Sequence, residues 1–173
     1  ELCFNGSNFY IRYANYSTST ALSSSNDVKA VTFNLNIQRP LAPRYATRGA
    51  NTPNTLEPKT SGQTRVTGSV TLTAFDDSEA DFIADMQGKT SKMLELFEDG
   101  SQIGTGTNNS IKIQIPTLKV TNATGQGIDG PSVFQQPTAE FEARKISTAP
   151  AGMSGVTDIR FTSTDEKTTA WIT

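Results

Sequence analysis

Two long segments of alternating apolar and polar residues constrain the fold of this chain more than any other feature. They read Val31-Thr-Phe-Asn-Leu-Asn-Ile37 and Val66-Thr-Gly-Ser-Val-Thr-Leu-Thr-Ala74. Because side chains alternate across a β-strand, each segment would place its apolar residues on one face and its polar residues on the other. The polar residues are hydroxyls and amides without a charged side chain. The pattern predicts two strands with a buried apolar face and an uncharged, solvated polar face.

The composition agrees with an all-β domain. The chain has 173 residues, of which 35% are apolar and 18% charged, and Ser and Thr together supply 41. Thr favours strands, and Ser favours turns. A chain of this length can bury one core. We therefore expect an all-β fold, mainly an antiparallel β-sandwich or barrel.

One short α-helix should flank this β domain, between Phe75 and Gly88. Asp76 is a candidate N-cap, Glu79 would complete a capping box, and Gly88 would end the helix. Its apolar stripe would consist of Phe82, Ile83 and Met86. Further strands are predicted at 9–13, 92–98, 111–115, 118–120, 138–145 and 156–163, with a turn at Asp99-Gly100. We divide the chain into a β domain, 1–148, and a linker with a C-terminal strand or arm, 149–173.

The connection between the two alternating segments, Pro40 to Gly62, is unusually long and rich in Pro and Gly. A structureless connection of that length inside a compact domain is uncommon and usually functional. Arg and Tyr are enriched where proteins contact one another. The residues of this kind in and beside the connection are Arg39, Arg44, Tyr45 and Arg48. A subunit contact and a solvated loop remain alternatives for this segment.

The residue types argue against catalysis. The chain has no His and a single Cys, Cys3, so the usual nucleophile–base pairs and His/Cys zinc sites are not expected. Glu140 and Glu142 could act as paired carboxylates, but alternating charges on a solvated edge strand are expected without catalysis, and we favour that interpretation. An acidic cluster could bind calcium, although helix capping explains most of it; its members are Asp76, Asp77, Glu79 and Asp81. We expect no enzymatic activity and no cofactor.

Charge and hydropathy exclude two further classes. The net charge is −2, and basic residues are scattered apart from the arginines at the long connection, so sequence-specific or phosphate-tracking nucleic-acid binding is not expected. No apolar run approaches the length of a membrane helix, and no signal-peptide pattern is present at the start of the sequence. We expect no membrane partner.

The order of these features resembles the tail tube proteins of long-tailed, siphovirus-like bacteriophages. The resemblance spans about Val28 to Lys145. It lies in the two alternating segments, the connection between them, Phe75-Asp-Asp with its short helix, Ile111-Lys-Ile-Gln-Ile-Pro116 and Ala139-Glu-Phe-Glu-Ala143. It implies a tail-tube-like β fold and self-assembly into stacked hexameric rings around a channel. Its partners would be further copies of itself, other tail proteins and double-stranded DNA passing through the lumen without specific binding. It also implies a place in the virion, after synthesis in the bacterial cytoplasm.

A lumen through which DNA slides should offer polar, weakly adhesive surface, and the polar faces of the two alternating segments meet that need. The residues expected to face the lumen are Thr32, Asn34, Asn36, Thr67, Ser69, Thr71 and Thr73. Those expected at a subunit interface are Arg39, Arg44, Tyr45 and Arg48. The alternative function is a carbohydrate- or cell-surface-binding β-sandwich. That function would need an exposed aromatic platform, and the only Trp is Trp171.

Overall fold

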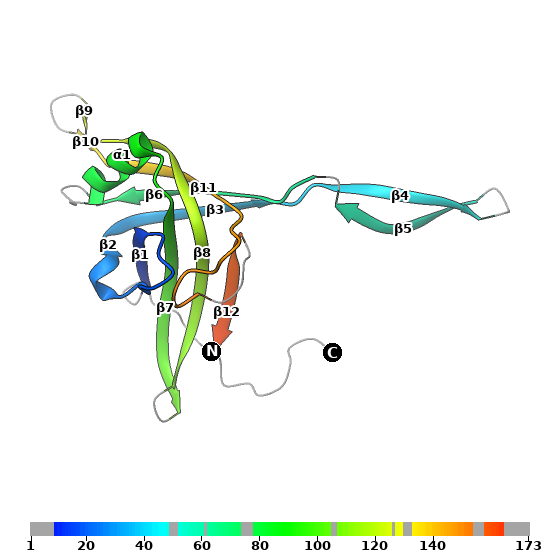
Figure 1. Ribbon diagram of the computed structural model, residues 1–173, viewed down its shortest axis with the longest axis horizontal. Helices are drawn as coiled ribbons and strands as arrows, with labels where there is room; N and C mark the ends of the chain where they lie inside the picture. Colours follow the sequence, from blue (N-terminus) through cyan, green and yellow to red (C-terminus); the bar gives the residue numbers. More distant parts are fainter. Residues whose placement is uncertain are drawn as a thin grey trace.

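The computed structural model describes residues 9–48, 52–60, 62–73, 78–104, 107–125, 127–129, 133–153 and 158–164. Its described part is mainly antiparallel β-structure with a single α-helix, which confirms the predicted fold class (Figure 1). The elements are β1 (Phe9–Asn15), the 3-10 helix η2 (Ser24–Asn26), β2 (Asp27–Val28), β3 (Ala30–Gln38), β4 (Leu41–Arg48), β5 (Thr52–Thr60), β6 (Arg65–Leu72), α1 (Ser78–Gly88), β7 (Lys92–Gly104), β8 (Thr107–Thr124), β9 (Gly127–Asp129), β10 (Val133–Gln135), β11 (Thr138–Ala143) and β12 (Arg160–Thr164).

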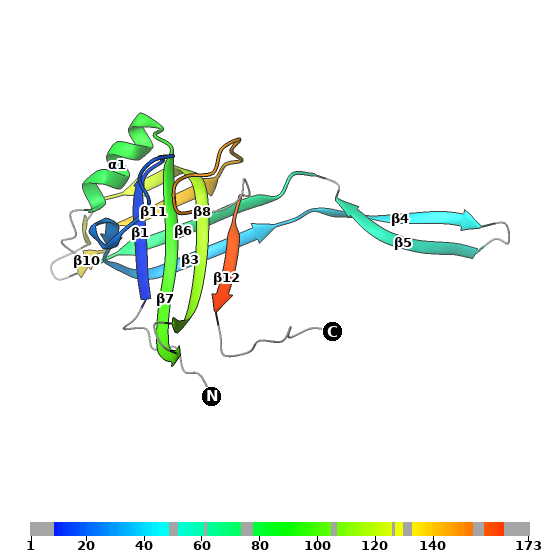
Figure 2. The same ribbon diagram turned by 60° about the horizontal axis from the view of Figure 1, so that its bottom comes forward.

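The main sheet has eight strands in the order β2-β1-β7-β8-β11-β6-β3, with β12 also paired to β8. Strand β8, 18 residues long, joins its two halves. Its first part pairs with β7 and β12, and from Leu118 onward it pairs with β11. Pro116 lies at this change of partner, where a residue without an N–H costs no ladder bond. Figures 1 and 2 show the β3–β6–β11 half crossing the β1–β7–β12 half, so the sheet folds over into two layers.

The core fills the space between these layers. Its buried members are Ile11, Tyr13, Val70, Leu72, Phe82, Leu94, Leu96, Ile115, Leu118, Val120, Ala139 and Phe141. Helix α1 closes one end of the core, with the Phe82 ring 4.4 Å from the Tyr13 ring. Met86 also packs against the cluster, as the predicted stripe requires. Asp76, the predicted N-cap, lies outside the described residues.

The apolar faces of the two alternating segments differ in burial. On β6, Val66, Val70 and Leu72 are at most 1% exposed, as predicted. On β3, the expectation is wrong at both ends, since Val31 is 50% and Ile37 is 44% exposed. Strand β3 is the edge of the sheet, so only β6 flanks it, and Val31 lies at an irregularity in the β3–β6 pairing. Phe33 and Leu35, at the centre of β3, still pack against the core.

The sequence predicted an irregular connection from Pro40 to Gly62. That prediction is wrong, because the connection forms an antiparallel hairpin of β4 and β5. Figures 1 and 2 show this hairpin extending well away from the body. Both strands of a two-stranded ribbon are edge strands, and an edge strand tolerates Pro where the missing N–H would face solvent. Pro53 pairs with Thr47, and the register shift between Ala42 and Arg44 accommodates Pro43.

One turn differs from the prediction, and the C-terminal strand pairs with the sheet. Strand β7 does not turn at Asp99-Gly100 but continues to Gly104, which pairs with Thr107. Beyond residue 148, the chain returns to the sheet, because β12 pairs with β8. On the way Pro150 and Met153 are buried, and the Ala151 N–H donates to the Ser17 carbonyl at 3.0 Å. The division of the chain at residue 148 remains a prediction, and Trp171 lies outside the described residues.

Candidate functional site

The polar residues predicted from the two alternating segments lie side by side on one face of the β3–β6 pair. Register pairs Thr32 with Thr71, Asn34 with Ser69, and Asn36 with Thr67. The Asn34 side-chain amide donates to the Ser69 hydroxyl at 3.5 Å. Thr73 lies one residue past the end of β6, and its hydroxyl donates to the Lys29 carbonyl at 3.3 Å. The sequence therefore grouped these residues correctly, with Thr73 at the margin of the group.

Strands β11 and β8 widen this face with residues that sequence reasoning did not assign to it. Glu140 pairs with Ser69, and Glu142 pairs with Thr67. We call the combined surface the polar face; its rows are Thr32, Thr71, Thr138 and Thr124; Asn34, Ser69, Glu140 and Asn122; and Asn36, Thr67, Glu142 and Lys119. The interpretation of Glu140 and Glu142 as residues of an edge strand is wrong, because β11 lies between β6 and β8. The alternation of 138–145 was visible in the sequence, but the order of the strands was not.

An ion-paired carboxylate divides the surface of this region into two hollows. Glu142 Oε1 lies 2.9 Å from Arg65 Nε, and its Oε2 lies 2.9 Å from an Arg144 guanidinium nitrogen. The Glu142 side chain is 19% exposed, against 62% for Arg65 and 54% for Arg144. On the polar face, a hollow of about 440 Å³ is lined by Asn34, Asn36, Thr67, Ser69, Thr121 and Glu140, among others. A second hollow, of about 520 Å³, lies on the other side of the ion pair.

Charge is unevenly distributed over the polar face. The row that contains Thr32 and Thr138 carries no charge, whereas the row of Glu142 contains Lys119 and is flanked by Arg65 and Arg144. Glu140 is exposed and takes part in none of the ion pairs found among the described side chains. The polar-face residues of β3 and β6 are thus uncharged as far as Arg65, the first residue of β6, as predicted. The complete polar face is charged, because β11 and β8 add Glu140, Glu142 and Lys119.

The predicted interface residues lie at or in the projecting hairpin. Arg39 is exposed, between β3 and β4. The other members are part of β4, where the backbone register pairs Arg44 with Leu56, Tyr45 with Thr55 and Arg48 with Thr52. Three of the four residues therefore lie on the projecting hairpin, and Arg39 lies just before it (Figure 1).

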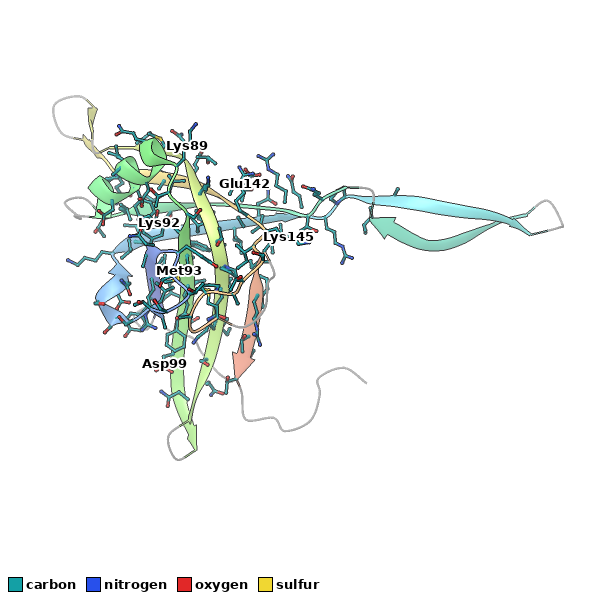
Figure 3. The ribbon with its side chains drawn as sticks, viewed as in Figure 1. Lys89, Lys92, Met93, Asp99, Glu142 and Lys145 are labelled. Atoms are coloured by element: carbon teal, nitrogen blue, oxygen red, sulfur yellow. The ribbon has the colours of Figure 1, made fainter. Side chains whose placement is uncertain are left out.

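Two buried polar clusters outside the polar face hold the other parts of the molecule together. Asp85 of α1 accepts a hydrogen bond from the Tyr13 hydroxyl at 2.7 Å and pairs with Lys92 Nζ at 2.7 Å. Burial, followed by the hydrogen bond to Asp85, raises the pKa of the Tyr13 phenol. The second cluster surrounds Glu95, whose partners are Gln114 at 2.7 Å, Arg12 at 3.3 Å and Lys112 at 3.7 Å. Figure 3 labels Lys92 near β1 and α1. Each buried carboxylate is compensated by cations, which is what a structural role requires.

Of the acidic cluster considered for calcium, Asp76 and Asp77 lie outside the described residues. Within the described part, no group of three or more His, Cys, Asp or Glu side chains comes together in a way that could hold a metal ion.

Helix α1 is too short to span a bilayer, and no described helix has the length and apolarity for it.

No protein-family model matches the sequence, and no curated protein matches it. Among solved structures, one titled "Structure of a type six secretion system protein" has a TM-score of 0.49 and 17% sequence identity, covering 79% of this chain and 78% of that chain. A functional proposal for this chain therefore rests on its own geometry.

Proposed function

We propose that this chain is a non-enzymatic structural protomer of a phage-type tail tube, which associates laterally into rings around a channel for DNA. The observation that carries the proposal is the half-sheet β3–β6–β11–β8. It combines a core-packed apolar face, a polar opposite face and two lateral edges without a strand partner among the described residues. The hexameric stoichiometry comes from the resemblance alone.

The strand directions in this half-sheet favour ring closure. Each of its neighbouring pairs is antiparallel, so β3 and the distal part of β8 run in opposite directions. Placing β3 of one copy beside β8 of the next would therefore extend a continuous antiparallel sheet around the ring. An unpaired strand edge is a ready template for another chain, and closure of a barrel removes every edge. On the β8 side, the Ala123 N–H is directed at Met86 Sδ at 3.2 Å, a weak acceptor that a strand carbonyl could replace.

The hairpin of β4 and β5 supports the same proposal. An isolated two-stranded hairpin is at best marginally stable in water. This hairpin projects from the body, and among the described residues no third strand pairs with it (Figure 2). Contact with a neighbouring subunit or ring would supply that missing support. We therefore retain Arg39, Arg44, Tyr45 and Arg48 as candidate interface residues.

Electron microscopy and light scattering of the purified protein test assembly. We expect rings or tubes, and we expect replacement of residues 41–60 by a short Gly-Ser bridge, or Arg44→Ala with Tyr45→Ala, to impair them while circular dichroism is preserved. Lys89→Ala, which removes an exposed charge just after α1, is the matched control and should assemble normally. A strict monomer at every concentration, also with tail components present, would contradict the proposal. Normal tubes formed without the hairpin would remove the hairpin from the interface.

The channel assignment has a separate test. Asn34→Lys and Thr71→Lys should leave the protomer's stability almost unchanged, because Asn34 is exposed and Thr71 is half-buried on the same polar face. In a ring, each would add a girdle of cations to the lumen and slow DNA ejection at low salt, an effect that weakens as salt is added. Normal ejection at low salt by particles carrying either variant would mean that this face does not line the channel.

A further inference from the structure

A basic hollow lies at the base of the hairpin, built from residues that are far apart in the sequence. It has a volume of about 520 Å³, and its cationic lining consists of Arg65, Arg144 and Lys145. Gln63 and Thr64, just before β6, and Glu142, Ala143 and Asp158 complete it. Figure 3 labels Glu142 and Lys145 at the end of β11, where the hairpin leaves the body. The charge of the lining is three cations against two carboxylates.

Glu142 positions both guanidinium groups of this hollow. It engages Arg65 through Nε and Arg144 through a single terminal nitrogen, at 2.9 Å each. A guanidinium has five N–H donors, so most donors of both arginines are left for another acceptor. The Glu142 side chain is largely buried, while the two arginine side chains that it holds are more than half exposed. A binding partner would thus meet two arginines whose side-chain freedom is already reduced.

Lys145 adds a cation that is not neutralised by the same carboxylate. It is exposed and takes part in none of the ion pairs found among the described side chains. Planar guanidinium groups match the oxygens of a phosphate, and an ammonium group adds a point charge. Hydroxyl and amide groups, here from Thr64 and Gln63, are further usual donors to phosphate.

We propose that this hollow binds a phosphate group, supplied either by inorganic phosphate or by the phosphodiester backbone of DNA. The proposal does not depend on ring assembly, because the hollow is complete within one chain. It goes beyond the proposed function, which assigns no ligand-binding site to the protomer. The carboxylate of Glu142 serves as a positioning group and does not contact the ligand.

The test measures binding of two probes to the full chain at low salt. Inorganic phosphate is titrated calorimetrically, and a fluorescent short DNA duplex is followed by anisotropy. Loss of one charge-assisted contact in Arg65→Gln, Arg144→Gln or Lys145→Gln should weaken binding about fivefold or more. Lys89→Gln is the matched control for Lys145→Gln, since Lys89 is an exposed cation beyond α1, outside the hollow (Figure 3). It should change binding less than about twofold.

The outcomes separate the two sources and the alternatives. DNA binding that inorganic phosphate displaces, and that the hollow variants lose, would identify the phosphodiester as the ligand. Phosphate binding without DNA binding would identify the free anion. Equal losses in Lys89→Gln and Lys145→Gln would indicate diffuse charge attraction and overturn the site, as would no binding of either probe. Lys145→Gln breaks no observed ion pair, so it stays informative if the arginine variants fold poorly. Failure here leaves ring assembly untouched, since that is read by microscopy.

Discussion

Gly68, at the centre of β6, offers the sharpest test of how the two layers pack. A Cβ atom added there would lie 2.5 Å from the Asn34 carbonyl oxygen and 2.9 Å from Phe141 Cε2, with Phe141 Cζ closer still. Phe141 is 2% exposed and stacks against Phe33, with their ring centroids 5.9 Å apart. The ring lies directly across from Gly68, its cross-strand partner. Position 68 therefore has no room for a Cβ atom between the Phe141 ring and the Asn34 carbonyl unless one of them shifts.

The size of the effect of Gly68→Ala follows from these distances. Ordinary carbon contacts begin near 3.4 Å, so β3 would have to move outward by about 0.9 Å, or the Phe141 ring would have to leave its place. Overpacking of this kind costs about 1–3 kcal/mol. Replacing Gly by Ala in a strand returns about 0.5–1 kcal/mol of backbone entropy and side-chain contact. We expect a net loss of about 1–2 kcal/mol in the free energy of unfolding, or about 2–8 °C in Tm.

Urea unfolding followed by circular dichroism measures this loss. Ser69→Ala is the matched control, because Ser69 is the adjacent residue on the polar face and its side chain makes one hydrogen bond among the described residues, at 3.5 Å from Asn34. It should change the free energy of unfolding by less than about 0.5 kcal/mol. If the cost comes from the ring, adding Phe141→Leu to Gly68→Ala should cost less than Phe141→Leu alone. A Gly68→Ala variant as stable as the wild type would refute the packing argument.

Three further predictions concern the core and its buried charges. Leu72→Ala should lower the free energy of unfolding by about 2–5 kcal/mol, because Leu72 is 1% exposed. Leu35→Ala, on the partly covered edge strand, should lower it by about 1 kcal/mol. Equal losses in urea melts would contradict the burial described here. Asp85→Asn should cost about 3 kcal/mol by leaving Lys92 buried without its carboxylate, while Asp81→Asn, exposed on the same helix, should cost under about 0.5 kcal/mol. The pKa of Tyr13 is raised by burial and by Asp85, so the unfolded phenol ionises first, and stability present below about pH 10 is lost as the pH rises further. Tyr13→Phe should make the fall of the free energy of unfolding with pH shallower by up to about 1.4 kcal/mol per pH unit. If that slope is unchanged between pH 9 and pH 11, the Tyr13 phenol does not have a raised pKa.

Much of the local structure could be predicted because it depends on neighbouring residues. Alternation in Val31–Ile37 and Val66–Ala74 was sufficient to predict the strands and to sort their side chains into two faces, since the period of a strand is a property of the backbone. The apolar stripe and the terminal Gly88 were sufficient to predict the helix. The same local reasoning failed at 40–62, because Pro and Gly argue against a strand only where its N–H groups must be used, and a two-stranded ribbon leaves some of them unused.

What the sequence determined by itself is therefore the principal strands of the main sheet, the single helix and the polar character of one face. Tertiary structure decided which strands are neighbours, and the physical reason is that pairing partners are chosen by packing between distant segments. That choice left β3 at an edge, with Val31 and Ile37 exposed, and placed β11 inside the sheet. It also brought Arg65 to Arg144 across Glu142, over 70 residues away in the chain. A basic hollow was thereby formed in a protein of net charge −2, from cations that the sequence shows only as scattered.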